Sequence, residues 1–442
     1  MPPKRRVIID TDPGNDDVLA ILLALSAPAS DLEVSLISVV TGNVDVRACL
    51  RNVVAIFHIL AQEISWRKSQ NLPPGFEGAT AYKPLVAIGA NEPLHEMGDN
   101  ADYFHGTDGV GGSTKTHPEF NPHQSWERLF EQPPPDDSLT SAAKTAVPDG
   151  HVEKQTEQEL FTNFTPSREP AHKEILRVLR ENEPDTIDII SIGPLTNLAL
   201  AAAEDPETFL RCKEVISMGG ALDMIGNVTP NGEFNVWADP HAAARVYALT
   251  SPKPSSTMPL TTEKFAGETL PPYPAHLSKQ LRLVLFALDI TERHVMTRSL
   301  FLNKTQLLAD KGSPLARWMM AFLTPMLNKM AMLHHGHDDD PSLALHDPLT
   351  VWYLLTQDDP AWQASKRSPE DIRVETQGQW TRGMTVGDKR PRRRRNSDGE
   401  APHDRGNWLG RVSGNRILRM MESPGEDIAG AWMLDRILGF VN

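Results

Sequence analysis

The sequence predicts an α/β fold, an open and mostly parallel doubly wound (Rossmann-like) sheet with helices on both faces. Two observations predict it. Short apolar runs alternate with helical patterns along most of the chain, which is the order expected of βαβ units on a parallel sheet. The 442 residues, of which 40% are hydrophobic and 23% charged, also suffice for one large domain with a substantial core.

The alternation starts near the N-terminus and continues past the middle of the chain. The apolar runs expected to form strands are residues 7–9, 34–40, 85–88, 187–192, 215–218 and 281–288. The amphipathic stretches expected to form helices are residues 17–25, 46–60, 171–182, 195–203 and 240–249. Because helices join the consecutive strands, the crossovers should cover both faces of the sheet.

Three stretches interrupt the alternation, at approximately residues 113–170, 250–278 and 389–407. They are rich in proline or charge and show little hydrophobic periodicity, which is typical of surface insertions or disordered loops. Because the alternation resumes after each of them, we assign residues 1–442 to a single domain.

Charge and composition exclude several classes of protein. The 44 basic and 58 acidic side chains give a net charge of −14, which repels nucleic acid and anionic membranes unless a local basic patch intervenes. No apolar run approaches the roughly 20 residues of a membrane span, and no secretory signal follows the N-terminus. Cys49 and Cys212 are the only cysteines, which excludes a disulfide framework and a thiolate metal cluster. We therefore expect a soluble, cytoplasmic protein.

The one strong basic run extends from Lys389 to Arg395. A solvated, disordered loop is the preferred interpretation of this run. Nuclear targeting or weak contact with a polyanion is the alternative, and a nuclear signal would place the protein outside the cytoplasm.

Four carboxylates follow the first predicted strand, in the run Asp10-Thr11-Asp12-Pro13-Gly14-Asn15-Asp16-Asp17. The carboxyl end of a parallel strand faces the crevice where open α/β sheets bind ligands. Left unpaired in a low dielectric, these acids would repel one another strongly, and a hard divalent cation resolves the repulsion. Oxygen-only ligands suit Ca²⁺ or Mg²⁺. Capping of the next helix by Asp16 and Asp17 is the alternative, but it leaves the other two acids unexplained.

An Asp-x-Asp pair after a strand also occurs in Mg²⁺-dependent phosphohydrolases of the haloacid-dehalogenase type, in which the first Asp is the nucleophile. Asp10 would take that role in this chain. Those enzymes usually carry Thr or Val two residues after the second Asp, whereas this chain has Gly14 there and continues with Asp16 and Asp17. The phosphohydrolase interpretation is therefore the weaker one.

Seven motifs, taken together, resemble those of the inosine–uridine nucleoside hydrolase family. In chain order they are residues 10–17; Val40-Thr41-Gly42-Asn43; His105-Gly106-Thr107-Asp108-Gly109; Ile192-Gly193-Pro194-Leu195-Thr196-Asn197; residues 218–220 with Asn227, 232–235 and 239–240; His346-Asp347-Pro348; and residues 381–385. One such motif alone would be weak evidence, but seven in the family's order span nearly the whole chain. The three insertions make this chain longer than typical members.

The resemblance implies Ca²⁺-dependent hydrolysis of the N-glycosidic bond of ribonucleosides, purine or pyrimidine or both, to free base and ribose in nucleoside salvage. It also implies a small-molecule ribonucleoside as partner, no nucleic acid or membrane partner, and a homodimer or homotetramer. A non-catalytic nucleoside-binding or scaffold protein is a further alternative. Retention of every candidate ligand argues against it.

The resemblance also assigns roles to individual residues. The Ca²⁺ ligands would be Asp12, Asp17, Asp347 and the backbone carbonyl of Ile192. Asp12 would also act as general base toward the attacking water, and Asp10 would orient the acids that hold the metal. The residues that would hold the ribose hydroxyls are Asp16, Asn43, Asn227, Glu233 and Asn235.

Local patterns support parts of this assignment. Asp347 precedes the helical pattern of residues 349–355, so it lies near a helix N-terminus, where capping is its alternative role. Glu233 and Asn235 have the i, i+2 spacing that puts two side chains on one side of an extended segment. A solvated loop is the alternative for that pair.

Assistance to the departing base is the least specified part of the chemistry. His346 is the preferred candidate, because a neutral imidazole is a poor ligand for Ca²⁺ and can serve the base instead. His105 is a candidate for substrate contact, with an ordinary loop histidine as the simpler interpretation. Further candidates, for which a flexible loop or core packing is simpler, are His334, His335, His337, Trp237 and Trp318. The base preference cannot be read from these residue types.

Overall fold

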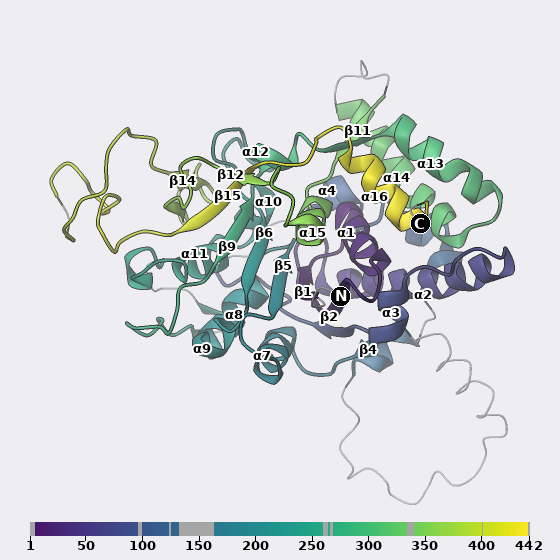
Figure 1. Cartoon of the computed structure of the whole chain (residues 1–442), viewed down its shortest axis with the longest axis horizontal. Helices are drawn as coiled ribbons and strands as arrows, with labels where there is room; N and C mark the ends of the chain where they lie inside the picture. The colour runs from purple at the N-terminus through teal and green to yellow at the C-terminus, as the bar shows by residue number, and fades with distance from the viewer. Residues whose placement is uncertain are drawn as a thin grey trace, which may run out of the picture.

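The chain folds around one large sheet, shown in the computed structural model of Figure 1. The structure describes residues 5–95, 100–122, 125–131, 163–259, 264–265, 268–333, 340–399 and 401–440. Within these ranges the sheet has nine strands in the order β12-β15-β9-β6-β5-β1-β2-β3-β4. They are β1 (Arg5–Thr11), β2 (Leu32–Val39), β3 (Leu85–Ile88), β4 (Thr165–Pro166), β5 (Ile187–Ser191), β6 (Glu214–Met218), β9 (Leu283–Phe286), β12 (Gln363–Ala364) and β15 (Ile417–Glu422). Only the pairing of β12 with β15 is antiparallel among these strands, so the predicted open, mostly parallel sheet is confirmed.

Helices cover both faces of the sheet, as predicted (Figure 1). On one face lie α1 (Asn15–Ser26), α2 (Val46–Ser69), α14 (Pro314–Leu333), α15 (Pro348–Thr356) and α16 (Ala429–Leu438), and on the other lie α7 (Ala171–Glu181), α8 (Thr196–Glu204) and α11 (Pro240–Ala248). Successive residues of β1 serve the two cores in turn, since Val7 and Ile9 pack in the first and Ile8 in the second. A strand buried on both faces is typical of a parallel sheet.

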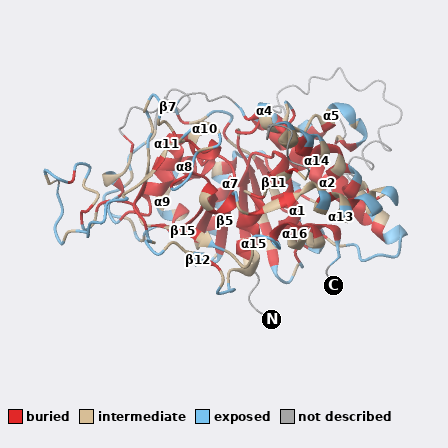
Figure 2. Cartoon of the chain, turned by 90° about the horizontal axis from the view of Figure 1, so that it is seen from above, coloured by how far each residue is buried: buried red, intermediate tan, exposed pale blue. Residues whose placement is uncertain are grey.

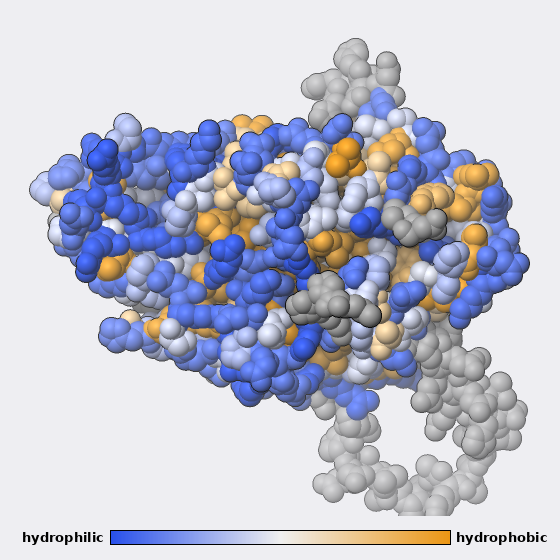
Figure 3. Space-filling view, viewed as in Figure 1, coloured by the Kyte–Doolittle hydropathy of each residue, from blue (hydrophilic) through white to orange (hydrophobic). Residues whose placement is uncertain are grey.

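Burial follows this layered arrangement. Figure 2 shows buried residues concentrated along the sheet and the helices that cover it, and exposed residues at the periphery. The face shown in Figure 3 is largely hydrophilic, with hydrophobic residues in scattered small patches. No helix in the described ranges is both long enough and apolar enough to cross a membrane.

The remaining described elements are mostly short. The helical ones are α3 (Glu77–Tyr82), α4 (Asp102–His105), α5 (Ser113–Thr116), η1 (Pro118–Phe120), η2 (Trp126–Leu129), α9 (Pro206–Phe209), α10 (Phe234–Ala238), η4 (Pro254–Ser256), α12 (Leu288–Thr291) and α13 (Arg298–Asp310). The antiparallel pairs are β7 (Lys264–Phe265) with β8 (Glu268–Thr269), β10 (Val295–Thr297) with β11 (Ser342–Ala344), and β13 (Ile372–Val374) with β14 (Thr385–Gly387).

Several predicted elements differ in extent from those observed, α2 and β9 among them. Helix α2 continues to Ser69, beyond the predicted end at residue 60, and its last turns still bury Ile64 and Arg67. The strand predicted at residues 281–288 is shorter in the structure, where β9 extends only from Leu283 to Phe286. The N–H of Leu288 donates to the Gly220 carbonyl (2.9 Å) and starts α12, so the chain leaves the sheet there.

The predicted insertion at residues 113–170 is too wide at both ends. Phe120, Trp126 and Phe164 are buried in the first hydrophobic core, and β4 pairs with β3 at the sheet edge. These aromatic residues are separated along the chain with no helical or strand period, which is why the pattern did not predict their burial. Residues 132–162 lie outside the described ranges.

The predicted loop at residues 389–407 is exposed for most of its length, but it is built around a buried carboxylate and is not a featureless loop. Asp404 is fully buried and accepts hydrogen bonds from the Leu409 N–H (2.9 Å), from Arg390 (3.2 Å) and from Arg395 (3.1 Å). Two arginines of the basic run thus converge on one acid. Hydrophobic periodicity carries no signal for such a polar centre.

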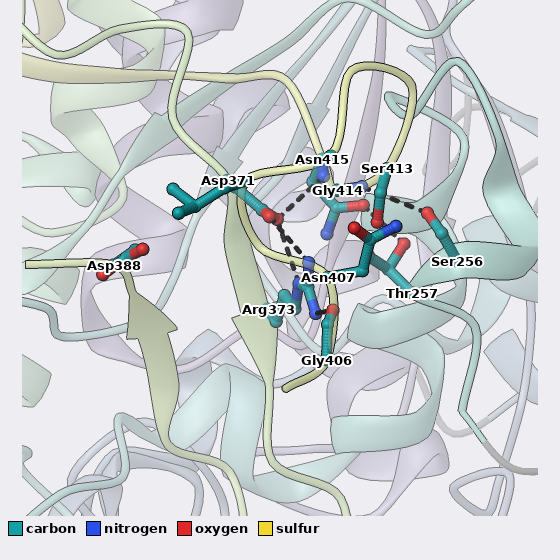
Figure 4. Close-up of polar contacts among 12 residues, drawn as sticks. Ser256, Thr257, Asp371, Arg373, Asp388, Gly406, Asn407, Ser413, Gly414 and Asn415 are labelled. Carbon is teal, nitrogen blue, oxygen red and sulfur yellow. Dashed lines mark hydrogen bonds and ion pairs between the residues drawn. The ribbon is translucent and has the colours of Figure 1, made fainter. Parts of the chain in front are cut away.

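The stretch 250–278 meets this C-terminal region through polar contacts (Figure 4). The hydroxyl of Ser256 accepts a hydrogen bond from the Gly414 N–H (3.1 Å), and the next residue, Asn415, donates its N–H to Asp371 (2.8 Å). The predicted surface insertion is therefore tied at its start to the segment that leads into β15.

Candidate active site

A cavity of about 440 Å³ opens where β1, β2, β5 and β6 end. The described residues that line it are Asp16, Asn43, Ala101, Tyr103, Phe104, His105, Ile192, Met218, Asn227, Glu233, Phe234, Asn235, Glu292, Met330, Leu343, Ala344, His346 and Asp347. Most of the predicted site residues are in this set. Asp10, Asp12 and Asp17 lie beneath it, fully buried. The strand-end rule therefore located the cavity correctly.

Asp16, Asp17 and Asp347 meet at the base of the cavity. Each offers a carboxylate oxygen within 4.8 Å of the other two, and all three side chains are buried. Burial, and then the charge of Asp17, raises the pKa of Asp16. Burial, and then the charge of Asp16, raises the pKa of Asp347 well above its usual range. Acids this close require either protons or a cation, so the group is a candidate metal site.

Asp347 is the N-cap residue of α15, but its side chain makes no capping hydrogen bond. The carboxylate of Asp347 therefore does not cap the helix, in contrast to the alternative role, and it stays available to a ligand. For Asp17 the alternative holds in part, because its carboxylate accepts a hydrogen bond from the Gly14 N–H (3.0 Å) at the start of α1. Its other oxygen accepts from the Thr11 hydroxyl (2.6 Å).

Asp12 has one engaged and one free carboxylate oxygen. Its Oδ2 accepts a hydrogen bond from the Asn43 N–H (2.7 Å). Its Oδ1 is buried and has no hydrogen-bond partner among the described residues. Burial, followed by the charge of Asp17, raises the pKa of Asp12 well above its usual range. An orphaned carboxylate oxygen is costly in a protein interior unless a cation or proton engages it.

Asp10 is enclosed by side chains beneath the cavity. Its Oδ1 accepts hydrogen bonds from the Ser38 hydroxyl (2.5 Å) and from Nδ2 of Asn197 (2.9 Å). Burial raises its pKa to about 7. Asp10 therefore connects the end of β1 to β2 and α8 through hydrogen bonds.

Asn43 connects the acids to one another. Its Nδ2 donates to the Asp12 carbonyl (3.1 Å) and to Oδ2 of Asp17 (3.0 Å), and its own N–H donates to the Asp12 carboxylate. Asn43 also lines the cavity, so it contacts the acids and faces the cavity at once.

Glu233 and Asn235 lie in the cavity wall, but not on an extended segment as predicted. Glu233 is the N-cap residue of α10, and its carboxylate accepts hydrogen bonds from the N–H groups of Asn235 (2.8 Å) and Val236 (3.0 Å). Asn235 lies in the first turn of that helix and donates to the Ile192 carbonyl (3.1 Å). The prediction was wrong because the extended backbone ends at Glu233, which caps the short helix that contains Asn235.

Asn227 reaches the same wall from the preceding loop. Its Oδ1 accepts a hydrogen bond from the Phe234 N–H (2.9 Å), which leaves its Nδ2 group for a ligand.

The carboxylate of Glu233 accepts a third hydrogen bond, from the Gly220 N–H (2.7 Å). The φ of +82° at Gly220 is left-handed, which favours glycine there.

His105 is buried in the cavity wall with a defined orientation. Its Nδ1 accepts a hydrogen bond from the Asn15 N–H (3.1 Å), so in the neutral ring Nε2 carries the hydrogen. Burial, helped by the charges of His346 and Lys329, lowers the pKa of His105 to about 3. The ring leaves no room for a side chain at residue 14, since a Cβ on Gly14 would lie 2.5 Å from Nδ1 of His105.

His346 lines the cavity next to Asp347. Its Nδ1 lies 2.7 Å from the Thr291 hydroxyl, and its Nε2 lies 3.9 Å from Oε1 of Glu292. Burial lowers the pKa of His346, and the charge of Glu292 opposes this shift. The two neighbours therefore face different parts of the cavity, with Asp347 in the acidic group and His346 against Glu292.

The sequence profile of the inosine-uridine preferring nucleoside hydrolase family matches residues 7–405. The chain belongs to this family. The non-specific ribonucleoside hydrolase RihC of Salmonella typhimurium is 28% identical to it, over 86% of this chain and 87% of RihC. An uncharacterized protein of Schizosaccharomyces pombe is 29% identical, over 87% of this chain and 89% of that protein.

Solved structures of nucleoside hydrolases share the fold. A plant nucleoside hydrolase aligns with a TM-score of 0.60 at 20% identity, over 99% of both chains. A purine-preferring ribonucleoside hydrolase from Gardnerella vaginalis aligns with a TM-score of 0.61 at 19% identity, over 98% of both chains. At these identities the likeness supports the fold alone.

As a nucleoside hydrolase, the chain cleaves the N-glycosidic bond of ribonucleosides, and its substrate is a small-molecule nucleoside. The family is metal-dependent, and the group of Asp16, Asp17 and Asp347 is a place where this nucleoside hydrolase could bind a metal.

Several sequence candidates lie away from the cavity of this nucleoside hydrolase. Trp318 is 2% exposed within the hydrophobic core, which agrees with the simpler interpretation of core packing. Trp237 stacks beneath the guanidinium of Arg382 (5.1 Å) and is not among the residues that line the cavity. His334, His335 and His337 lie outside the described residues.

The sequence reasoning missed Glu292 and the aromatic pair Tyr103 and Phe104, all of which line the cavity. A signal for Glu292 existed, because it follows closely after β9 and open α/β sheets bind ligands at the carboxyl ends of their strands. Tyr103 and Phe104 directly precede His105 and carry no spacing signal of their own.

Proposed function

We propose that this nucleoside hydrolase depends on Ca²⁺ and releases free base and ribose from purine or pyrimidine ribonucleosides in nucleoside salvage. The observation that carries the proposal is the buried group of Asp16, Asp17 and Asp347 at the base of a cavity of about 440 Å³. Sites for small molecules typically have volumes of about 300–1,000 Å³.

The residues present fit a hard divalent cation. Every side-chain atom that the group offers is a carboxylate oxygen, and the orphaned Oδ1 of Asp12 adds another. Ca²⁺ is preferred to Mg²⁺ because it accepts about six to eight oxygen ligands in flexible geometry, which leaves places for the ribose hydroxyls. The proposed ligands are Asp12, Asp17, Asp347 and the carbonyl of Ile192.

Asp16 belongs to the same acidic group, but we assign it to the ribose. Asp16 lines the cavity, whereas Asp17 is fully buried and is not among the residues that line it. The residues proposed to hold the ribose hydroxyls are Asp16, Asn43, Asn227, Glu233 and Asn235, all of which line the cavity. Asp10 is proposed to orient the metal ligands from below, and His105 to contact the substrate from the wall.

Cleavage of an N-glycosidic bond builds positive charge on the ribose ring. Fixed carboxylates beside the ring stabilise that charge electrostatically. When bound, the cation would lower the pKa of a water molecule and help to hold the ribose. Asp12 is proposed to take the proton of the attacking water, in addition to its role as a ligand.

The departing base also needs a hydrogen-bond donor or an acid. We propose His346 for this role, because its ring lines the cavity and Nε2 is the ring atom on the side of Glu292. His346 is adjacent to Asp347 in the chain, so one short segment would serve both the metal and the base.

The two alternative functions receive less support. A phosphohydrolase would need Asp10 as an exposed nucleophile, but Asp10 is fully buried and bonded to Ser38 and Asn197. A non-catalytic scaffold would have no need of the complete acidic group with an orphaned Asp12 oxygen.

We further propose a homodimer or homotetramer in the cytoplasm, on the basis of the family alone. Size-exclusion chromatography with light scattering measures the oligomeric state. A monomer at micromolar concentration would overturn that part of the proposal.

A panel of nucleosides with reducing-sugar detection tests the function, with and without chelator. We expect hydrolysis of at least one purine or pyrimidine ribonucleoside, its loss in excess EDTA, and its recovery on addition of Ca²⁺. The melting temperature should fall on removal of the metal, because ligand binding to the folded state alone stabilises that state. Full hydrolysis in a sample with no measurable metal would overturn the metal dependence, and trapping of an aspartyl-phosphate on Asp10 would favour the phosphohydrolase.

A further inference from the structure

Glu292 is an acid of the cavity that the proposed chemistry does not use. It follows α12, lines the cavity, and its side chain is 41% exposed, so it stands toward the opening. The other wall acid, Glu233, accepts three backbone hydrogen bonds. For Glu292 the contact found among the described residues is the 3.9 Å approach of its Oε1 to Nε2 of His346. Its oxygens are therefore available to a ligand.

The surroundings of His346 select one tautomer. If Nδ1 carried the hydrogen, the lone pair of Nε2 would face the carboxylate of Glu292, which is unfavourable. With the hydrogen on Nε2, Nδ1 accepts a hydrogen bond from the Thr291 hydroxyl 2.7 Å away. The cavity wall thus presents a donor, the Nε2–H of His346, beside an acceptor, the carboxylate of Glu292.

A donor beside an acceptor complements the edge formed by N7 and the C6 substituent in adenine, but not the same edge in a 6-oxopurine. Adenine presents the N7 acceptor next to the N6 amino donor, whereas a 6-oxopurine such as guanine or hypoxanthine presents two acceptors, N7 and O6. Pyrimidines have no N7. We infer that His346 and Glu292 together recognise the N7–N6 edge of adenine, so that the enzyme prefers adenosine to inosine and guanosine.

This inference rests on the proposed function, in which His346 faces the base, and it differs from the inosine and uridine preference in the family's name. The rest of the wall agrees with a purine. Tyr103, Phe104, Met330 and Leu343 line the same cavity and offer apolar and aromatic surface to the faces of a ring. With N7 held by the Nε2–H of His346, the group that assists departure already lies on the correct atom of adenine.

Steady-state kinetics on adenosine, inosine and uridine test the inference, with the wild type and the variants Glu292→Gln and Glu292→Ala. We expect a wild-type kcat/KM for adenosine at least about tenfold above that for inosine, because a mismatched pair of hydrogen bonds carries such a factor. Glu292→Gln should bring the ratio close to one, since an amide can donate to O6 as well as accept from N6. The kcat/KM for uridine should change little in either variant.

Glu127→Gln is the matched control, because Glu127 is exposed and is not among the residues that line the cavity. It should leave the adenosine-to-inosine ratio unchanged. A wild-type ratio at or below one overturns the inference. The inference is also overturned if Glu292→Gln lowers kcat/KM equally for adenosine and inosine and leaves their ratio unchanged. Glu292 would then only position His346.

Binding separates this inference from the proposed function. Calorimetry at saturating Ca²⁺ on the Asp12→Asn variant measures the dissociation constants of adenosine and inosine without turnover. Tighter binding of adenosine that Glu292→Gln abolishes supports the inference even if no nucleoside is hydrolysed by the wild type. Hydrolysis of several nucleosides, with equal binding of adenosine and inosine, supports the function and overturns the inference.

Discussion

Asn197 donates a hydrogen bond from Nδ2 to Oδ1 of Asp10 (2.9 Å) and thereby joins the first turn of α8 to the end of β1. The same Nδ2 group reaches the Ser38 hydroxyl (3.0 Å), and Oδ1 of Asn197 accepts from the Ala90 N–H (2.9 Å). One buried amide therefore ties together the ends of three neighbouring strands beneath the acidic group.

Asn197→Ala should destabilise the folded protein by about 2–4 kcal/mol, because it leaves buried partners, including the Asp10 carboxylate, without their hydrogen bonds. Urea unfolding followed by circular dichroism measures this change. Asn396→Ala is the control, since Asn396 is exposed in the C-terminal loop. An unfolding free energy equal to that of the wild type would show that water replaces the amide at no cost.

Asp12→Asn should leave the fold intact and reduce kcat by on the order of 10³-fold or more, because it removes the proposed base and weakens the metal site together. Stopped assays on the best nucleoside substrate, with a melting curve beside them, measure both effects. A variant within tenfold of the wild type would mean that another group accepts the proton of the water.

His346→Ala and Asp347→Ala should fail in different ways. Asp347→Ala should weaken Ca²⁺ binding, with partial recovery of activity at high Ca²⁺. His346→Ala should keep metal affinity and lose kcat, and lose it more on a natural nucleoside than on a nitrophenyl riboside, because an activated leaving group needs no proton. Calcium titration and kinetics on both substrates measure the contrast. Equal losses of His346→Ala on the two substrates would make it a positioning residue.

Asp404→Ala should lower stability by about 1–3 kcal/mol, because the N–H of Leu409 and the side chains of Arg390 and Arg395 lose their shared acceptor. The value of kcat/KM should stay within about twofold of the wild type, since Asp404 does not line the cavity. Thermal melting and kinetics measure the two quantities. Asn396→Ala, at an exposed position of the same loop, is the control.

Asp188 should make stability depend on pH. Burial raises the pKa of Asp188 to about 6, against 3.8 for an ordinary aspartate, and the nearby Lys213 (3.4 Å) only partly offsets this. The folded protein therefore binds more protons than the unfolded chain between these values, so the free energy of unfolding falls as pH rises from about 4 to 6 and levels off above it. Guanidinium unfolding across this range should show a shallower fall in Asp188→Asn. The exposed Asp427→Asn should behave as the wild type does.

Much of the framework could be predicted from the chain alone. The alternation of apolar runs and helical patterns identified the parallel sheet. The period at which hydrophobic residues recur indicates whether a segment is a helix or a strand and which of its faces is buried. The run from Asp10 to Asp17 identified the end of β1 as the candidate site, because four acids in eight residues demand a counter-charge. Both signals are local, and local patterns are what a sequence displays.

Only the tertiary structure decided the contacts between distant segments. It placed Asp347 with Asp16 and Asp17, and it left the carboxylate of Asp347 free of the cap that its position suggested. It made Glu233 the cap of α10 and placed Asn235 inside that helix. It also set Glu292 beside His346, which are far apart in the chain and have no shared period. Polar groups pair by geometry across the fold, and hydrogen-bond geometry leaves no periodic trace in the sequence.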